Sequence, residues 1–351
     1  MELEEALELS MKRGASDVHV SVGRPIMIRV DGVLVELDDH ILAPQDVESL
    51  MMPILSDRQK EELISEGEID FAYSLASIGR FRLNVFKQRG TYAAALRLLP
   101  FKIPSPEDLK IPAAVVEMTK KKRGLVLVTG PTGSGKSTTL ASLINVINQD
   151  QPVHIITLED PIEYLHKSKT AVVVQREIGI DTLGYAPALR AALRQDPDII
   201  LLGEMRDLDT IATAVTAAET GHLVFSTLHT IGAAPTIDRI VDVFPPHQQE
   251  QIRIQLATVL ECVVSQQLLP LASAEGGRCG AFEVMVANPA IRNMIREAKT
   301  FQIPSMMQTN RKAGMITMDD SLYELYHSGR VSGETALTFA QDYAYLSRKI
   351  I

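Results

Sequence analysis

The sequence predicts an α/β protein in which a domain with a mostly parallel sheet follows a smaller α+β domain. Up to about residue 100, strand-like segments recur at hairpin spacing, whereas beyond residue 113 strand and helix segments alternate. Between these regions, residues 101–112 contain three prolines and no strong period, which is typical of a linker. We therefore expect domains over 1–100 and 113–351, joined by a linker over 101–112.

The first domain is expected to contain two β-hairpins and two helices. In the first hairpin, Asp31-Gly32 is a turn between apolar runs over 25–30 and 33–37. In the second, residues 80–86 alternate between polar and apolar, and residues 92–98 are expected to form the strand that pairs with them. Between the hairpins, two segments with helical patterns complete an α+β domain, over 45–55 and 56–65.

In the second domain, short apolar segments are predicted strands, and helical segments separate them. The strands are expected over 125–129, 154–158, 171–174, 199–202 and 223–227, and the helices over 113–122, 137–148, 185–194, 210–220, 233–241 and, as one long helix, 247–268. Asn288-Pro289 then predicts the capped start of a further helix, and the remaining chain is expected to be helical. Because alternating strands and helices need crossover connections, the sheet should be mostly parallel.

The composition is that of an ordinary globular protein and argues against several classes. With 46% hydrophobic and 23% charged residues, the 351-residue chain can form a core in each domain. The net charge of −9 argues against a duplex-DNA binder, because such proteins contact phosphates through Lys and Arg. Two cysteines are too few for a four-cysteine zinc site. Since no apolar run approaches a membrane span and the first residues are acidic, we expect a cytoplasmic protein.

Residues 130–137 form a complete phosphate-loop motif, G-x-x-x-x-G-K-[ST]. An apolar segment precedes the motif and a predicted helix follows it, as phosphate binding by backbone N–H groups at a helix N-terminus requires. The motif therefore predicts an ATP or GTP site with Lys136 on the β and γ phosphates and Ser137 on Mg²⁺. The residues expected to surround the phosphates are Gly130, Pro131, Thr132, Gly133, Ser134, Gly135, Lys136, Ser137 and Thr138.

Carboxylates follow two of the predicted strands, at the edge where open α/β sheets bind ligands. Glu204 comes after the strand over 199–202 and suits a catalytic carboxylate, although Gly203 stands where many such enzymes place a Mg²⁺-binding Asp. A second acidic segment follows the strand over 154–158 and contains Glu159, Asp160 and Glu163. We expect this segment to belong to a site for Mg²⁺ and water rather than to a solvated turn.

Histidines and arginines complete the set of candidate residues. His222 and His229 bracket the predicted strand over 223–227, and one of them is expected to sense the γ-phosphate. Arg80 and Arg97 are predicted on strands of the first domain, where they could simply lie on exposed strand faces. Alternatively, an arginine from a neighbouring domain or subunit can stabilise the charge of the γ-phosphate.

Several of these segments together resemble the ATPases of type II secretion and type IV pilus systems: the phosphate loop and residues 157–163, 200–207 and 220–229. Residues 290–297, Ala-Ile-Arg-Asn-Met-Ile-Arg-Glu, are similar to the Ala-Ile-Arg-Asn-Leu-Ile-Arg-Glu signature of the pilus retraction branch. Extension-type relatives carry a four-cysteine zinc motif, which two cysteines cannot form. Residues 184–187, Gly-Tyr-Ala-Pro, depart from the Ser-Phe-Ala-Asn expected in the family.

The resemblance implies a PAS-like first domain, a RecA-like second domain and a ring of six subunits with ATP bound between the two domains. It also implies a motor that hydrolyses ATP with Mg²⁺ to retract a type IV pilus. The residues that it places in the site are the general base Glu204, the acidic box of Glu159, Asp160 and Glu163, His229 of a histidine box, and Arg80 and Arg97 on ATP.

The expected partners are the other subunits of a homo-hexamer, a platform protein of the pilus machinery in the inner membrane, and related pilus ATPases. The motor is expected in the cytoplasm at the inner face of that membrane, and nucleic acid is not an expected partner. Two other functions stay open, a nucleotide-gated regulatory module with slow hydrolysis and a RecA-like DNA translocase. Acidic charge disfavours the translocase but does not exclude strand binding in the pore of a ring.

The segment 290–297 is expected to form an amphipathic helix. Ile291, Met294 and Ile295 share its apolar face, whereas Arg292 and Arg296 are expected to point outward. Because no catalytic motif lies nearby in sequence, we expect the charged face to transmit motion or to contact the pilus machinery.

Overall fold

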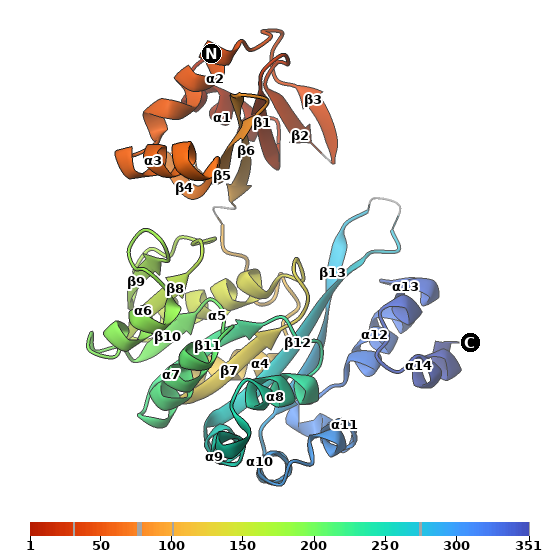
Figure 1. The fold of residues 1–351 in the computed structure, drawn as a ribbon. Coiled ribbons are helices and arrows are strands. Elements are labelled where there is room, and N and C mark those ends of the chain that lie inside the picture. Colours follow the sequence, from red (N-terminus) through yellow and green to blue (C-terminus); the bar gives the residue numbers. More distant parts are fainter. Residues whose placement is uncertain (31, 76–78, 100–101, 274–275, 351) are drawn as a thin grey trace. The chain divides into compact units, whose positions relative to one another are not determined.

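The computed structural model describes residues 1–30, 32–75, 79–99, 102–273 and 276–350 (Figure 1). They form two compact units, one of Met1–Lys102 with Pro161–Leu165 and one of Ile103–Asp160 with His166–Ile351. Each unit has its own sheet and its own hydrophobic core. The predicted fold class, a parallel-rich α/β domain preceded by a small α+β domain, is confirmed. Asp31 of the first predicted turn and Phe101 at the start of the predicted linker lie outside the described residues.

The first unit has a six-stranded antiparallel sheet in the order β3-β2-β1-β6-β5-β4. Its strands are β1 (Asp17–Ser21), β2 (Met27–Val30), β3 (Val33–Glu36), β4 (Glu68–Leu75), β5 (Gly79–Gln88) and β6 (Thr91–Leu99), and its helices are α1 (Leu3–Lys12), α2 (Pro44–Met51), the 3₁₀ turn η1 (Met52–Ile54) and α3 (Asp57–Glu66). Both predicted hairpins are present as β2–β3 and β5–β6. The prediction missed β1 and β4, in which charged or polar side chains alternate with buried ones, and it missed α1.

The second unit has a seven-stranded sheet in the order β13-β12-β7-β11-β10-β8-β9, in which only β13 runs antiparallel to its neighbour. The strands are β7 (Gly124–Thr129), β8 (His154–Glu159), β9 (Val172–Glu177), β10 (Ile199–Leu202), β11 (Leu223–Leu228), β12 (Leu260–Pro270) and β13 (Arg278–Val286). The helices are α4 (Ala113–Val116), α5 (Lys136–Asp150), α6 (Tyr185–Ala192), α7 (Leu208–Glu219), α8 (Ala233–Asp242), α9 (Pro246–Val259), α10 (Pro289–Arg296), α11 (Ile303–Thr309), α12 (Met318–His327), α13 (Gly333–Thr338) and α14 (Tyr343–Ile350), with 3₁₀ turns η2 (Glu117–Lys120), η3 (Thr300–Gln302) and η4 (Arg311–Ala313).

Helices cover both faces of this sheet, which explains why its central strands are apolar throughout. On β7, Leu125 and Leu127 belong to the core shared with α6 to α10, whereas Val126 and Val128 belong to the core shared with α4 and α5. All carboxyl ends of the parallel strands therefore meet at one edge, which holds the phosphate loop, Glu204 and His229, whereas His222 lies at the opposite, amino end of β11.

The predicted long helix over 247–268 is wrong. Helix α9 ends at Val259, and β12 begins at Leu260 and pairs in parallel with β7. The β12 segment interrupts its apolar residues with Glu261, Ser265, Gln266 and Gln267, so it does not show the strict alternation by which periodicity would separate a strand from a helix. The adjacent β-branched pair Val263 and Val264 was the available signal for a strand.

Residues 103–112, which belong to the predicted linker, are part of the second unit. Ile111 is buried there in the core that also contains Val115 and Met118. In the part of the chain that the structure describes, no helix is both long and apolar enough to cross a membrane.

Candidate functional site

The phosphate loop connects β7 to α5 at the carboxyl edge of the parallel strands. Gly130, Gly133 and Gly135 have φ values of 140°, 79° and 89°. Residues that carry a Cβ rarely adopt such positive φ values, whereas glycine adopts them readily. Because α5 begins at Lys136, the free N–H groups of its first turn follow directly on the loop. The loop thus has the backbone arrangement that binds phosphate oxygens.

Gln266 of β12 holds this loop in place, and the sequence analysis missed it. Its Oε1 accepts a hydrogen bond from Thr139 Oγ1 at 2.7 Å. Its backbone oxygen lies so close to the loop that a Cβ on Gly130 would approach it to 2.2 Å. The register pairs Ser265 with Thr129, the last residue of β7, which brings Gln266 beside the loop. The contact was not predicted because this segment was expected to be helical. The polar Gln266 among buried residues was an available signal that the segment contacts a polar group.

Lys136 is buried, and its amine contacts the loop itself. Nζ donates to the backbone oxygens of Gly130 at 2.8 Å and Pro131 at 2.9 Å. Ser137, the next residue, is exposed, whereas the buried hydroxyl of Ser134 has no hydrogen-bond partner among the described residues. The loop therefore offers a cation and two hydroxyls for a phosphate group and its metal.

Glu204 lies just beyond the end of β10, and two basic side chains contact its carboxylate. Arg206 Nε lies 2.5 Å from Oε1, and His229 Nε2 lies 3.3 Å from Oε2. The side chain of Glu204 is only 11% exposed, whereas that of Arg206 is 71% exposed. The hydrogen bond to Glu204 raises the pKa of the Arg206 guanidinium. Because β10 and β11 are parallel neighbours, two predicted site residues, Glu204 and His229, come together; the role of Arg206 was not predicted.

A cavity of about 440 Å³ lies beside this cluster. Three basic side chains line it, those of Arg206, His229 and Arg239, together with Met205, Ile211, Leu228, Thr230 and Val243. The edge of the site therefore combines open space with positive charge, which suits an anion.

The acidic segment after β8 is divided between the two units. Glu159 ends β8, and its Oε1 accepts hydrogen bonds from Thr157 Oγ1 at 2.6 Å and Gln175 Nε2 at 3.0 Å. Asp160 is exposed, and Glu163 lies in the segment Pro161–Leu165 of the first unit.

The residues near the loop provide few protein oxygen ligands for Mg²⁺. Across the described residues, no three His, Cys, Asp or Glu side chains converge on a point that could hold a metal ion. Ser137 and Asp160 are both exposed. Mg²⁺ is commonly held by one or two protein oxygens together with nucleotide phosphates and water. These residues fit a metal that arrives with a nucleotide.

Tyr185, the first residue of α6, brings its hydroxyl to Gly203. A Cβ on Gly203 would lie 2.8 Å from Tyr185 Oη. Burial raises the pKa of Tyr185, and the negative charges of Asp160 and Glu204 raise it further. The phenol therefore keeps its proton at neutral pH.

Arg80 and Arg97 lie on β5 and β6 of the first unit. Nη1 of Arg80 donates to Ser74 Oγ at 3.5 Å. Nε of Arg97 lies 2.9 Å from Asp17 Oδ1, and the Arg97 side chain is 70% exposed. Within its own unit, Arg97 thus has a structural partner and a large exposed surface.

Arg292 does not point outward as predicted. Its Nη1 donates to the backbone oxygens of Ala257 and Thr258 in the last turn of α9, each at 2.8 Å, and its Nη2 lies 2.7 Å from Glu261 Oε1. Helix ends leave carbonyl groups without partners, and an arginine from α10 satisfies two of them here. Arg296 is exposed, as predicted.

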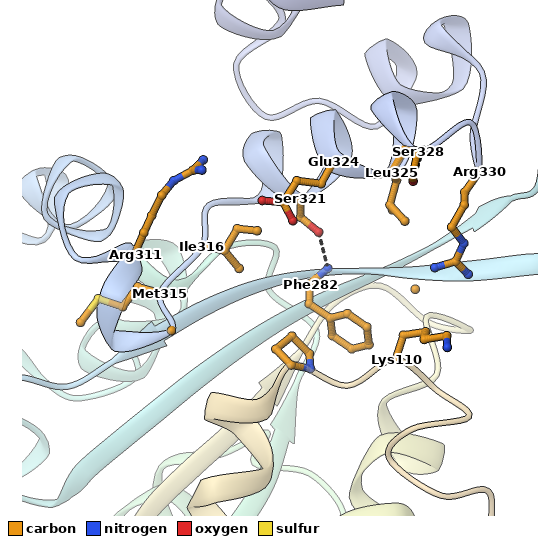
Figure 2. A pocket seen from close by; sticks show the side chains of 13 residues that line it. Lys110, Phe282, Arg311, Met315, Ile316, Ser321, Glu324, Leu325, Ser328 and Arg330 are labelled. Atoms are coloured by element: carbon orange, nitrogen blue, oxygen red, sulfur yellow. Dashed lines mark hydrogen bonds between the residues drawn. The ribbon is translucent and has the colours of Figure 1, made fainter.

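A second cavity, of about 550 Å³, lies in the same unit between residues 110–112, β13 and the C-terminal helices. Figure 2 shows Lys110 and Arg330 at one end of it and the hydrogen bond from Phe282 N to Ser321 Oγ, 3.1 Å long, across its wall. None of the predicted site residues lines it.

Known proteins resemble this chain over nearly its whole length. A family model described as "Type II/IV secretion system protein" matches residues 2–337. The type IV pilus retractation ATPase PilT of Pseudomonas aeruginosa is 48% identical over 336 residues, which cover 96% of this chain and 97% of that protein. A twitching motility protein of Neisseria gonorrhoeae is 48% identical over 316 residues, 90% of this chain and 84% of that protein.

A solved structure extends the similarity to the fold. The crystal structure of the pilus retraction motor PilT with bound ADP has a TM-score of 0.94 and 49% identity, and it covers 99% of both chains. The resemblance inferred from the motifs is thereby confirmed. This chain belongs to the type II/IV secretion system protein family.

Proposed function

We propose that this chain is the ATP-hydrolysing motor of type IV pilus retraction. The observation that carries the proposal is the near-full-length similarity, at 48% identity, to a retraction ATPase. The chemistry of the site supports it, because a complete phosphate loop lies at the same sheet edge as a buried carboxylate.

In this proposal the loop binds ATP and Glu204 activates water. Lys136 exchanges the carbonyls of Gly130 and Pro131 for the β and γ phosphates, which are stronger partners for an ammonium group. Ser137, with Asp160, would hold Mg²⁺ when it is bound with the nucleotide, and the metal would supply neutralisation of the phosphate charge. Glu204 then accepts a proton from the attacking water.

Arg206 and His229 fix the direction in which Glu204 points, because each binds a different carboxylate oxygen. Glu159 has a different role. Its bonds to Thr157 and Gln175 make it a support for the end of β8 more than a free metal ligand.

The first domain supplies cations to the nucleotide. We assign domain 1–100 to a PAS-like fold, domain 113–351 to a RecA-like fold and 101–112 to the segment that joins them. Arg80 and Arg97 reach ATP when the first domain closes, within a subunit or across a subunit boundary. Glu163 moves with the same closure and is the second carboxylate available as a base.

The assembly is a homo-hexamer, the symmetric arrangement that lets closure in one subunit move the next. The motor acts in the cytoplasm on a platform protein at the inner membrane, together with related pilus ATPases. Retraction follows from repeated domain closure and opening during ATP hydrolysis.

The function is tested in a piliated strain that lacks its own retraction motor. Expression of this chain should restore pilus retraction, scored as shortening of labelled pili and as twitching. Lys136→Ala, which should not bind ATP tightly, and Glu204→Gln, which should bind it without turnover, should both fail at equal protein levels.

ATP hydrolysis by the purified protein distinguishes this function from the two other functions. Slow ATP hydrolysis by the purified hexamer without any retraction would indicate a regulatory module. ATP hydrolysis that rises on addition of single-stranded DNA would indicate a translocase.

A further inference from the structure

Gly203 leaves a gap at a place where many phosphate-loop ATPases have a carboxylate. In those enzymes an Asp at the end of this strand helps the loop Ser or Thr to hold Mg²⁺. Here the residue before Glu204 has no side chain. A metal at this edge therefore lacks one of its usual protein contacts.

The hydroxyl of Tyr185 lies in that gap. It is the nearest atom to the position of a Cβ on Gly203, at 2.8 Å, and the next are Leu158 O at 3.2 Å and Glu159 Cα at 3.5 Å. The ring of Tyr185 is partly buried against the core that covers this face of the sheet.

A neutral phenol can replace the missing carboxylate as an acceptor for metal-bound water. Water on Mg²⁺ donates hydrogen bonds, and the phenol oxygen accepts one while its O–H donates to a neighbouring acceptor. The negative charges of Asp160 and Glu204 act electrostatically on this hydroxyl.

We propose that the Tyr185 hydroxyl takes the place of the Asp missing at position 203 and hydrogen-bonds a water of the nucleotide-bound Mg²⁺. Tyr185 is in this view a positioning residue, which acts on the metal and on Glu204 through water. The inference rests on the proposed function only in requiring that the site binds Mg²⁺ with a nucleotide.

The first test measures binding of a fluorescent ADP analogue to the hexamer as Mg²⁺ is titrated. Tyr185→Phe should raise the half-saturating Mg²⁺ concentration about tenfold, the lower end of the usual effect of losing a partner of a metal ligand. Its affinity for the analogue without Mg²⁺ and its thermal unfolding temperature should match those of the unmodified protein. Tyr343→Phe is the control, because Tyr343 is 62% exposed on α14.

The second test restores the carboxylate. Gly203→Asp alone should lower the unfolding temperature, because its Cβ overlaps the Tyr185 hydroxyl. Combined with Tyr185→Phe, which removes that oxygen, the same substitution should regain thermal stability and return the Mg²⁺ dependence toward that of the unmodified protein.

The outcomes separate this inference from the proposed function. If the unmodified protein and Tyr185→Phe both bind the analogue with the same dependence on Mg²⁺, the role of Tyr185 is overturned and the proposed function is not. Absence of nucleotide binding by the unmodified protein would overturn the proposed function and this inference together.

Discussion

Arg206 Nε lies 2.5 Å from Oε1 of Glu204, so the proposed general base is already held by a cation. The arginine is mostly exposed and the carboxylate is mostly buried, which means that Arg206 covers Glu204 from the solvent side. A carboxylate that abstracts a proton must point at the attacking water, and small displacements of catalytic groups lower rates strongly. Arg206 therefore has an orienting role that its position after Glu204 in the sequence does not reveal.

Replacing Arg206 should slow the chemical step without weakening substrate binding. We expect Arg206→Ala to lower kcat about tenfold and to leave KM within about twofold, because an orienting bond is lost while the phosphate loop is intact. Steady-state ATP hydrolysis gives both constants. Arg194→Ala is a matched control, since Arg194 is an exposed arginine in the same unit. A rise in KM with unchanged kcat would assign Arg206 to nucleotide binding instead.

The phosphate loop should tolerate a methyl group at one glycine and not at another. On Gly130 a Cβ would lie 2.2 Å from the backbone oxygen of Gln266, whereas on Gly133 it meets nothing within 4 Å. Gly133→Ala should cost about 1 kcal/mol, the strain of its positive φ. Gly130→Ala should lower the thermal unfolding temperature clearly further, because a strand has to move. Equal unfolding temperatures of the two variants would show that Gln266 does not brace the loop.

Arg292 should stabilise the protein, and Arg296 should not. We expect Arg292→Ala to destabilise by about 1 to 3 kcal/mol, because two carbonyls of α9 and Glu261 lose a charged donor. Arg296→Ala should stay within about 0.5 kcal/mol. Denaturant unfolding followed by circular dichroism measures both. If Arg292→Ala unfolds like the unmodified protein and abolishes retraction in cells, the arginine contacts the pilus machinery as its sequence context suggested.

The C-terminal helices should lose stability in acid through Asp320. Burial by itself raises the pKa of this carboxyl group, but hydrogen bonds from Arg311, Lys349 and two hydroxyls outweigh it and lower the pKa to about 2. A folded-state pKa below the unfolded value favours folding above about pH 4, and this contribution, about 2 kcal/mol, disappears as the pH falls toward 2. The difference in unfolding temperature between the unmodified protein and Asp320→Asn should therefore shrink from pH 6 to pH 2.5. A difference that does not depend on pH would contradict this origin.

Local sequence patterns sufficed for the loop and the neighbouring strand ends. The glycines and Lys136 form a contiguous motif, and Glu204 and His229 each follow an apolar run, so parallel pairing brings them together. The contacts of Gln266, Tyr185 and Arg292 depend on pairing and packing between segments far apart in the chain. No periodicity within one segment encodes such contacts, and the β12 segment lacked the strict alternation that would have distinguished it from a helix.

The central claim is that Glu204 activates water in an ATP site formed by the phosphate loop. The most direct test measures ATP turnover by Glu204→Gln at saturating ATP, with ATP affinity measured in parallel. Since the amide keeps the shape of the side chain but cannot accept the proton, we expect kcat to fall at least about 100-fold and affinity to change less than about threefold. Near-normal turnover at equal affinity would contradict the account and move the role of base to Glu163.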